Sequence, residues 1–150
     1  IRAKAMGSWS FNVAASQTGG LADTQTTIGY DPSTTNTASN KLAKPPVAVV
    51  RKAIGGAVLG SMNNKTVRLA KSITNQKGTQ VWDYVVDTKI AGAVKLTFPG
   101  ITGLPKNVSV RMMDLSGNRT IDARASSSYL FNAKERSRYT FRFILTNVGK

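Results

Sequence analysis

Apolar and polar side chains alternate along several short segments of this chain. The clearest cases are WSFNV at 9–13, VKLTF at 94–98 and YTFRFIL at 139–145. Successive side chains of a β-strand point to opposite faces, so each segment would turn one face toward a core and the other toward water. The pattern is typical of half-buried antiparallel strands and predicts an all-β protein.

Further segments carry a strand signal, and turn residues separate them. The remaining strands are predicted at 47–50, 66–73, 80–88, 108–114, 120–124 and 126–131. Between two of them, LSGN predicts a tight turn in which Gly117 or Asn118 takes a positive φ. Short strands joined by polar turns predict an immunoglobulin-like antiparallel β-sandwich of about seven to nine strands.

Two regions depart from this alternation. Residues 8–40 are rich in Ser, Thr, Asn and Gly, and a long N-terminal loop is predicted at 17–44, interrupted by TTIGY, where Ile28 and Tyr30 could anchor it. The stretch RKAIGGAVLGSMNN at 51–64 contains three glycines, which argue against a stable helix, and its structure stays open.

The length of 150 residues suits one domain, and we expect a single β-sandwich at 8–150. Residues 1–7 are basic and do not look like core, so they form a candidate assembly arm that reaches a neighbouring subunit. The arm residues are Ile1, Arg2, Lys4 and Met6. A disordered end is the alternative for this segment.

Cysteine and histidine are both absent. Their absence removes disulfides, thiol nucleophiles, His-based triads and Cys/His metal sites, and we expect no cofactor. Secreted structural modules can dispense with both residues, so we expect a secreted or cell-surface protein. The sequence has no run of about 18 apolar residues, so no membrane-spanning helix is expected.

The formal net charge is +14. Between Lys41 and Lys77 there are eight cationic residues and no acidic one, and a second cationic group lies in and beside the last strand. Such a surface attracts polyanions through counterion release. The candidate polyanion-binding residues are Lys41, Lys44, Arg51, Lys52, Lys65, Arg68, Lys71, Lys77, Lys134, Arg136, Arg138 and Arg142. The alternative is that the charge keeps an exported protein soluble or suits an acidic neighbour.

Two aspartates in WDYVVDT raise the question of a catalytic pair. Asp83 and Asp87 are four positions apart, which places them about 13 Å apart on one strand face, too far for a glycosidase pair. We expect them to pair with Lys or Arg of neighbouring strands.

The other acidic residues also have structural explanations. Asp23 and Asp31 could contribute to a Ca²⁺ loop, but Asx turns explain them better. In MDLSGNRTIDAR, we expect Arg124 to form a scaffold ion pair with Asp114 or Asp122.

Several motifs follow one another in a set order. They are WSFNV at 9–13, the aspartate Asp23, IGYD at 28–31, KPP at 44–46, WDYVVDT at 82–88, VKLTF at 94–98, GLP at 103–105, VRMMDLSGNRTIDAR at 110–124, SSSYLF at 126–131 and YTFRFIL at 139–145. Together they resemble the Ig-like C-terminal modules of large secreted or cell-surface bacterial proteins, akin to type IX sorting domains and the Ig-like part of flagellar hook-cap proteins. The resemblance weakens at 47–73. It implies a folding, anchoring or export unit with no catalytic residue.

These features predict a non-catalytic, secreted structural module that serves as a cell-surface anchor, assembly subunit or filament component. Its expected partners are further copies of the chain or a larger surface assembly. The alternative function is binding to an acidic polysaccharide, an anionic envelope, an acidic protein or nucleic acid without sequence readout. An enzyme is the third reading, and it requires carboxylates such as Asp83 and Asp114 to meet in a pocket.

Overall fold

The computed structural model describes residues 8–17, 21–33, 41–43, 54–62 and 65–149. These residues form eleven strands and a short 3-10 helix, η3 (Ile101–Gly103). The strands are β1 (Trp9–Gln17), β2 (Leu21–Tyr30), β3 (Lys41–Ala43), β4 (Ile54–Met62), β5 (Lys65–Thr74), β6 (Gly78–Thr88), β7 (Gly92–Thr97), β8 (Ser109–Asp114), β9 (Arg119–Asp122), β10 (Ser128–Ala133) and β11 (Ser137–Val148). The all-β prediction is confirmed. The expected number of strands was too low.

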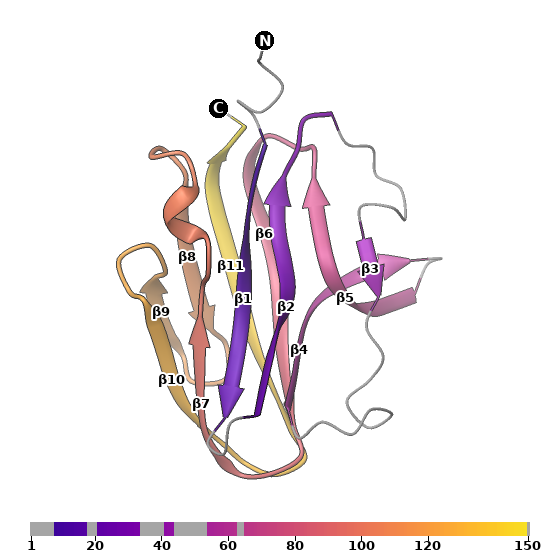
Figure 1. Cartoon of the computed structure of the whole chain (residues 1–150), viewed down its shortest axis with the longest axis vertical. Coiled ribbons are helices and arrows are strands. Elements are labelled where there is room, and N and C mark those ends of the chain that lie inside the picture. Colours follow the sequence, from indigo (N-terminus) through magenta and orange to yellow (C-terminus); the bar gives the residue numbers. More distant parts are fainter. Residues whose placement is uncertain (1–7, 18–20, 34–40, 44–53, 63–64, 150) are drawn as a thin grey trace.

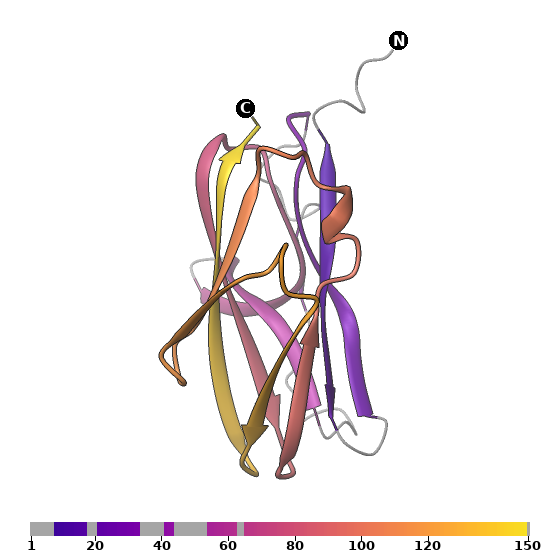
Figure 2. The same ribbon diagram turned by 90° about the vertical axis from the view of Figure 1, so that its left-hand side faces the viewer.

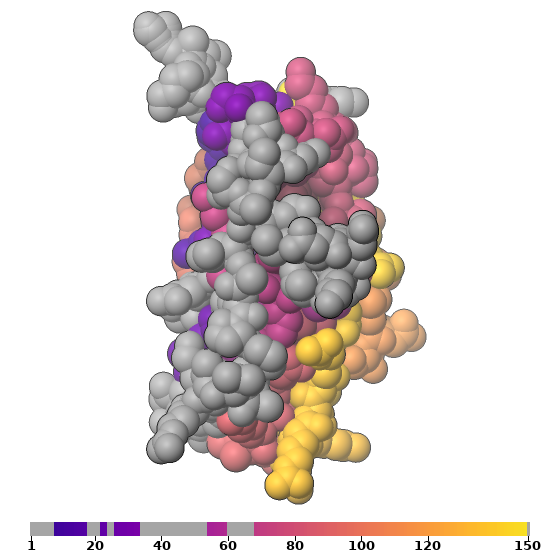
Figure 3. Space-filling view, turned by 90° about the vertical axis from the view of Figure 1, so that its right-hand side faces the viewer, coloured from indigo at the N-terminus to yellow at the C-terminus, as the bar shows by residue number. Residues whose placement is uncertain are grey.

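All the described strands belong to one sheet, in the order β10-β7-β1-β2-β5-β4-β6-β11-β8-β9, with β3 paired to β5 beside this path. The sheet curls, so that β1, β2 and β7 lie in one layer and β6, β8 and β11 in the other (Figures 1 and 2). On the side opposite β10, the β5–β6 turn and the last strand reach the surface (Figure 3). The pairing is antiparallel except between β2 and β5, which are parallel, so the expectation of a purely antiparallel sheet was wrong.

The long N-terminal loop predicted at 17–44 was also wrong, because β2 occupies much of it. Threonine is β-branched and suits a strand despite its polarity. Two buried polar side chains of β2 are satisfied by the backbone of β4: Oδ2 of Asp23 accepts from the Gly56 N–H at 3.1 Å, and Oγ1 of Thr26 donates to the Gly56 carbonyl at 3.2 Å. These bonds allow a polar sequence to form an inner strand.

The glycine-rich stretch at 51–64, left open above, contains β4. Gly56 is required there by a neighbour, since a Cβ at this position would lie 1.9 Å from the hydroxyl of Tyr84. A glycine in a strand therefore marks a close approach of a large side chain to the backbone. The strand predicted at 47–50 lies outside the described residues.

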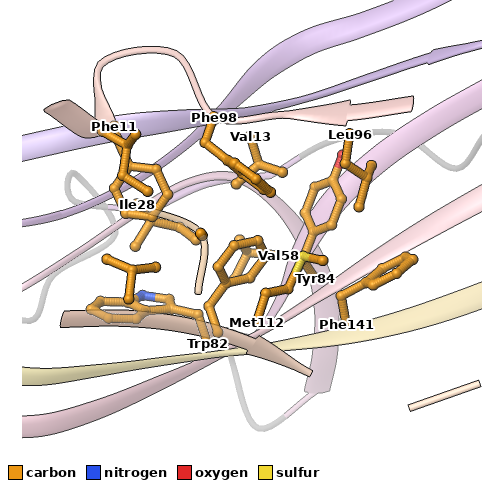
Figure 4. Packing of buried hydrophobic residues seen from close by; sticks show 14 of the residues in the cluster. Phe11, Val13, Ile28, Val58, Trp82, Tyr84, Leu96, Phe98, Met112 and Phe141 are labelled. Carbon is orange, nitrogen blue, oxygen red and sulfur yellow. The ribbon is translucent and has the colours of Figure 1, made fainter. Parts of the chain in front are cut away.

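Alternation in β11 follows the prediction, whereas in β6 the consecutive residues Tyr84, Val85 and Val86 are all buried. Phe141, Phe143 and Leu145 of β11 are fully buried, while Arg142 between them points outward. Aromatic side chains from both layers meet in one core, among them Phe98 and Phe141 (Figure 4). Phe98 also packs edge-on against Phe143. Asn118 takes a φ of 55°, which confirms the tight turn between β8 and β9.

Candidate interaction site

Two aspartates of β6 form ion pairs with two arginines of β11 on the outer face of the sheet. Asp83 lies directly opposite Arg142, and Asp87 lies directly opposite Arg138. Nε and Nη2 of Arg142 donate to Asp83 at 2.8 and 3.2 Å, and the same atoms of Arg138 donate to Asp87 at 2.7 and 3.0 Å. These hydrogen bonds raise the pKa of both guanidinium groups. The cross-strand pairing expected for the aspartates is confirmed.

Arg68 of β5 also reaches Asp87, and it crosses β4 to do so. Its Nε lies 3.5 Å from Oδ2 of Asp87, and its side chain is 10% exposed. Gly55 and Ala57 share this outer face of β4, and their small size leaves room for the long side chain. Three of the candidate polyanion-binding cations, Arg68, Arg138 and Arg142, are thus paired with carboxylates.

The other candidate cations are placed differently. Lys77, Lys134 and Arg136 are exposed, and Lys71 is half-buried. Lys41 and Lys65 begin β3 and β5, and their side chains are not described. The remaining candidates, Lys44, Arg51 and Lys52, and the arm residues Ile1, Arg2, Lys4 and Met6 lie outside the described residues.

All seven acidic residues of the chain lie in the described part, and most are engaged in structural contacts. Asp31 accepts from the backbone N–H and the hydroxyl of Ser33, which confirms its Asx turn. Asp23 is buried in β2 rather than in a turn, so the same expectation for it was wrong. Asp122 and Glu135 are the two acidic residues that are exposed to solvent. The exterior therefore carries cations with few acidic neighbours.

A buried hydrogen bond ties β10 to β8. The Tyr129 hydroxyl donates to Oδ2 of Asp114 at 2.6 Å, and Oδ1 accepts from the N–H groups of Ser116 and Gly117. The guanidinium carbon of Arg119 lies 5.4 Å from the centre of the Tyr129 ring. Burial and the bond to Asp114 raise the pKa of Tyr129 to about 12.

Arg124 forms no ion pair with Asp114 or Asp122 among the described contacts, so that expectation was wrong. Its guanidinium group instead donates to three backbone carbonyls of one loop, those of Leu104, Pro105 and Val108, at 3.2, 2.6 and 2.7 Å. Asp122 is already used, because its Oδ1 accepts the backbone N–H of Arg124 at 2.9 Å. Arg124 therefore fixes the segment between β9 and β10 onto the loop after η3.

A cavity of about 320 Å³ lies beside this segment, where β7 ends and β10 begins. Its walls come from the end of β7, from η3 and from the segment that leads into β10, which Figure 2 shows on the side of the molecule facing the viewer. The lining residues are Thr97, Phe98, Pro99, Ile101, Thr102, Ala123, Arg124, Ala125, Ser126 and Ser127. Apolar walls with a few polar groups are typical of sites that accept a side chain or a small ligand.

Strand β10 ends the sheet and, among the described strands, pairs only with β7. Its sequence SYLFNA contains no charged residue and no proline, and Leu130 is 62% exposed. Its inner face is held by aromatic contacts, since the Phe131 ring lies 5.0 Å from Tyr139 and 5.2 Å from Phe141. The open backbone edge is thus carried by a strand that is fixed to the core.

The carboxylates required for the enzyme reading do not meet. Asp83 lies on the outer face of the sheet, whereas Asp114 is buried on the inner face.

Within the described ranges, no three His, Cys, Asp or Glu residues lie close enough to hold a metal ion. In the same ranges, no helix is long and apolar enough to cross a membrane.

Comparison of the chain with protein-family models, with curated proteins and with solved structures finds no match in any of the three.

Sequence reasoning missed the β10 edge and the cavity beside it. The signal for the edge was present, because SYLFNA is a strand without a charged or proline residue. The cavity depends on the way Arg124 holds its loop, and nothing in the order of residues indicates those carbonyl contacts.

Proposed function

We propose that this chain is a non-catalytic interaction module, an Ig-like β-sandwich of the cell surface or of secreted material, that joins a larger assembly through the open edge of β10. The observation that carries the proposal is an end strand with an exposed apolar side chain and no protecting charge or proline. Unpaired N–H and C=O groups of an edge strand are satisfied when a neighbouring strand pairs with them.

The opposite end of the sheet supports the choice of β10. Strand β9 has four residues, and Arg119 and Asp122 stand at its two ends. Short length and charge are the usual means by which proteins prevent edge-to-edge pairing. Strand β10 has six residues and neither kind of protection. Of the two ends of the described β10-to-β9 path, one is therefore protected and the other is open.

Sedimentation velocity over a range of concentrations tests the proposal. Leu130→Lys places a charge on the open edge, and Val81→Lys is the matched control, because Val81 is 54% exposed and lies on β6, where it pairs with Ile144 of β11 rather than with β10. We expect the wild-type chain and Val81→Lys to self-associate as concentration rises, and Leu130→Lys to remain monomeric. A wild-type chain that stays monomeric, or three chains that behave alike, contradicts the proposal.

Polyanion binding is the second candidate function. It is favoured by the way the acidic residues are used, since buried contacts, turns and ion pairs engage most of them while exposed cations such as Lys77, Lys95 and Lys106 remain at the surface. A cationic surface of this kind binds polyanions with an affinity that falls steeply with salt. Retention on immobilised heparin at rising salt concentration tests it.

A further inference from the structure

The edge of β10 and the cavity adjoin each other. The first residue of β10, Ser128, pairs with Thr97, and Thr97 lines the cavity together with Ser126 and Ser127. A strand that paired along β10 and extended past Ser128 would therefore bring a side chain to the region of the cavity. Strand-addition sites commonly combine backbone pairing, which provides affinity, with a pocket that selects a side chain.

Contacts with the core and with a neighbouring loop hold the site in place. The Tyr129 hydroxyl is bonded to Asp114 on its inner side, and Phe131 packs against Tyr139 and Phe141. Arg124 holds the segment before β10 through three carbonyls. A site that is already ordered loses little entropy on binding, so backbone pairing contributes more fully to affinity.

Cations surround this site. Lys95 lies directly across from Leu130 on β7 and is exposed, Lys134 and Arg136 follow β10 in exposed positions, and Arg124 lines the cavity. Two exposed carboxylates, Asp122 and Glu135, are near in sequence, so the four cations outnumber the acidic groups by two. Complementary charge therefore favours an acidic occupant.

The chain itself does not provide an acidic strand. Its seven acidic residues are scattered, and the sole segment with two of them within five positions is WDYVVDT. That segment lies in β6, which is flanked by β4 and β11 inside the sheet. The candidate arm at 1–7 contains Arg2 and Lys4 and no acidic residue. These 150 residues therefore contain no acidic strand that suits β10, and charge complementarity favours a segment of another protein.

We propose that β10 and the adjoining cavity form a docking site for an extended acidic segment of another protein, which pairs its backbone with β10 and places one apolar side chain in the cavity. This inference rests on the proposed function, in which β10 is the joining edge, and it names the chemistry of the natural partner. Two copies of the purified chain then pair through the same edge of β10, but with lower affinity than an acidic strand.

Fluorescence anisotropy with labelled peptides tests the proposal. The probe is a peptide of about eight residues, close to the length of one strand, in which valine and glutamate alternate and a leucine stands at one end. Two versions carry backbone N-methyl groups, one at odd positions and one at even positions. Successive backbone groups of a strand point to opposite edges, so one version should lose binding by about tenfold or more, equivalent to about 1.4 kcal/mol, while the other binds like the parent.

Two protein variants test the cavity. Ala125→Trp fills it from an exposed position on its wall, and Ala91→Trp is the matched control at an exposed position in the turn between β6 and β7. We expect Ala125→Trp to weaken binding of the leucine peptide by about tenfold and Ala91→Trp to leave it unchanged. Equal effects of the two variants would contradict a role for the cavity.

The outcomes separate this inference from the function on which it rests. If both methylated peptides bind like the parent, or both weaken alike, the attraction is electrostatic only and the inference is overturned. If no peptide binds while Leu130→Lys still abolishes self-association, the inference fails and the joining edge stands. If the peptide binds and also dissolves the self-associated chain, both are supported.

Discussion

Arg138 donates two hydrogen bonds to Asp87 from the neighbouring strand, and Arg68 approaches the same carboxylate from the other side of β4. One carboxylate of β6 thus connects three strands, β5, β6 and β11. The two arginines differ in burial, since the side chain of Arg138 is 50% exposed and that of Arg68 is 10% exposed. Because Asp87 pairs with a buried guanidinium group, it should contribute more to the stability of the fold than Asp83, the other aspartate of β6.

Removal of Asp87 should therefore destabilise the fold more than removal of Asp83. Asp87→Ala leaves the buried guanidinium group of Arg68 without this carboxylate, and we expect a loss of about 1–3 kcal/mol in the free energy of unfolding. Asp83→Ala removes a partly exposed pair with Arg142 and should have a smaller effect. Urea denaturation of both variants measures the difference, and equal losses would contradict the structural role given to Arg68.

The hydroxyl groups of Tyr84 and Tyr129 should respond in opposite ways to replacement by phenylalanine. The Tyr84 hydroxyl is buried with no hydrogen-bond partner among the described residues, whereas that of Tyr129 donates to Asp114. Tyr84→Phe removes an unsatisfied polar group and should be neutral or stabilising by about 1 kcal/mol, and Tyr129→Phe should cost about 1–3 kcal/mol. Thermal or urea unfolding of both variants decides the matter. If Tyr84→Phe destabilises the fold as much as Tyr129→Phe does, the Tyr84 hydroxyl forms a hydrogen bond in the folded protein, and the prediction is contradicted.

The raised pKa of Tyr129 predicts a loss of stability in alkali. Burial and the bond to Asp114 raise this pKa from 10.0 to about 12, so between these values the folded chain keeps a proton that the unfolded chain releases. The stabilisation that Tyr129 contributes is therefore fully present below about pH 10 and is lost as the pH rises toward 12. Burial also raises the pKa of Tyr84, which acts in the same direction.

Tyr129→Phe should make this alkaline decline shallower. The comparison is made by measuring urea midpoints of the wild-type chain and the variant at several alkaline pH values. Lysine titration affects both proteins alike and cancels in the difference. An identical pH dependence in the two proteins would refute the coupling between Tyr129 and folding.

If polyanions bind the surface, the exposed cations should carry the salt dependence. Lys134→Ala removes an exposed cation and should reduce the slope of log affinity against log salt by about 0.9, the value for one phosphate contact. Arg142→Ala has the same formal charge change, but Arg142 is already paired with Asp83 and its removal should leave the slope nearly unchanged. Heparin or DNA binding at several salt concentrations measures both slopes.

Sequence patterning was reliable where a strand has one apolar and one polar face. Phe11 and Val13 of β1 and Phe141 and Phe143 of β11 are buried as alternation predicts. It failed where the satisfaction of polar groups depends on distant residues. The polar strand β2 is stabilised by the backbone of Gly56, which is 33 positions from Asp23, and no local signal reveals that contact.

In the candidate site, too, the sequence predicted what depends on strand periodicity and missed what depends on distant residues. Pairing of Asp83 and Asp87 with cations followed from strand periodicity and from the scarcity of acidic residues, and the structure confirms it. The identity of the partner arginines depends on the register between β6 and β11, which the sequence of either strand leaves undetermined. The contacts of Arg124 with three carbonyls depend on a loop whose path is set by packing.

The central claim, that β10 is the joining edge, is tested most directly by single-cysteine cross-linking. The chain has no cysteine, so Leu130→Cys and Val81→Cys each introduce one exposed thiol, on the open edge and on an inner strand respectively. Position 130 is near the middle of β10, and antiparallel pairing of two copies would bring two such thiols within disulfide distance. The account predicts disulfide-linked dimers for Leu130→Cys and monomers for Val81→Cys under the same oxidising conditions. Equal cross-linking of the two variants, or none in either, would contradict it.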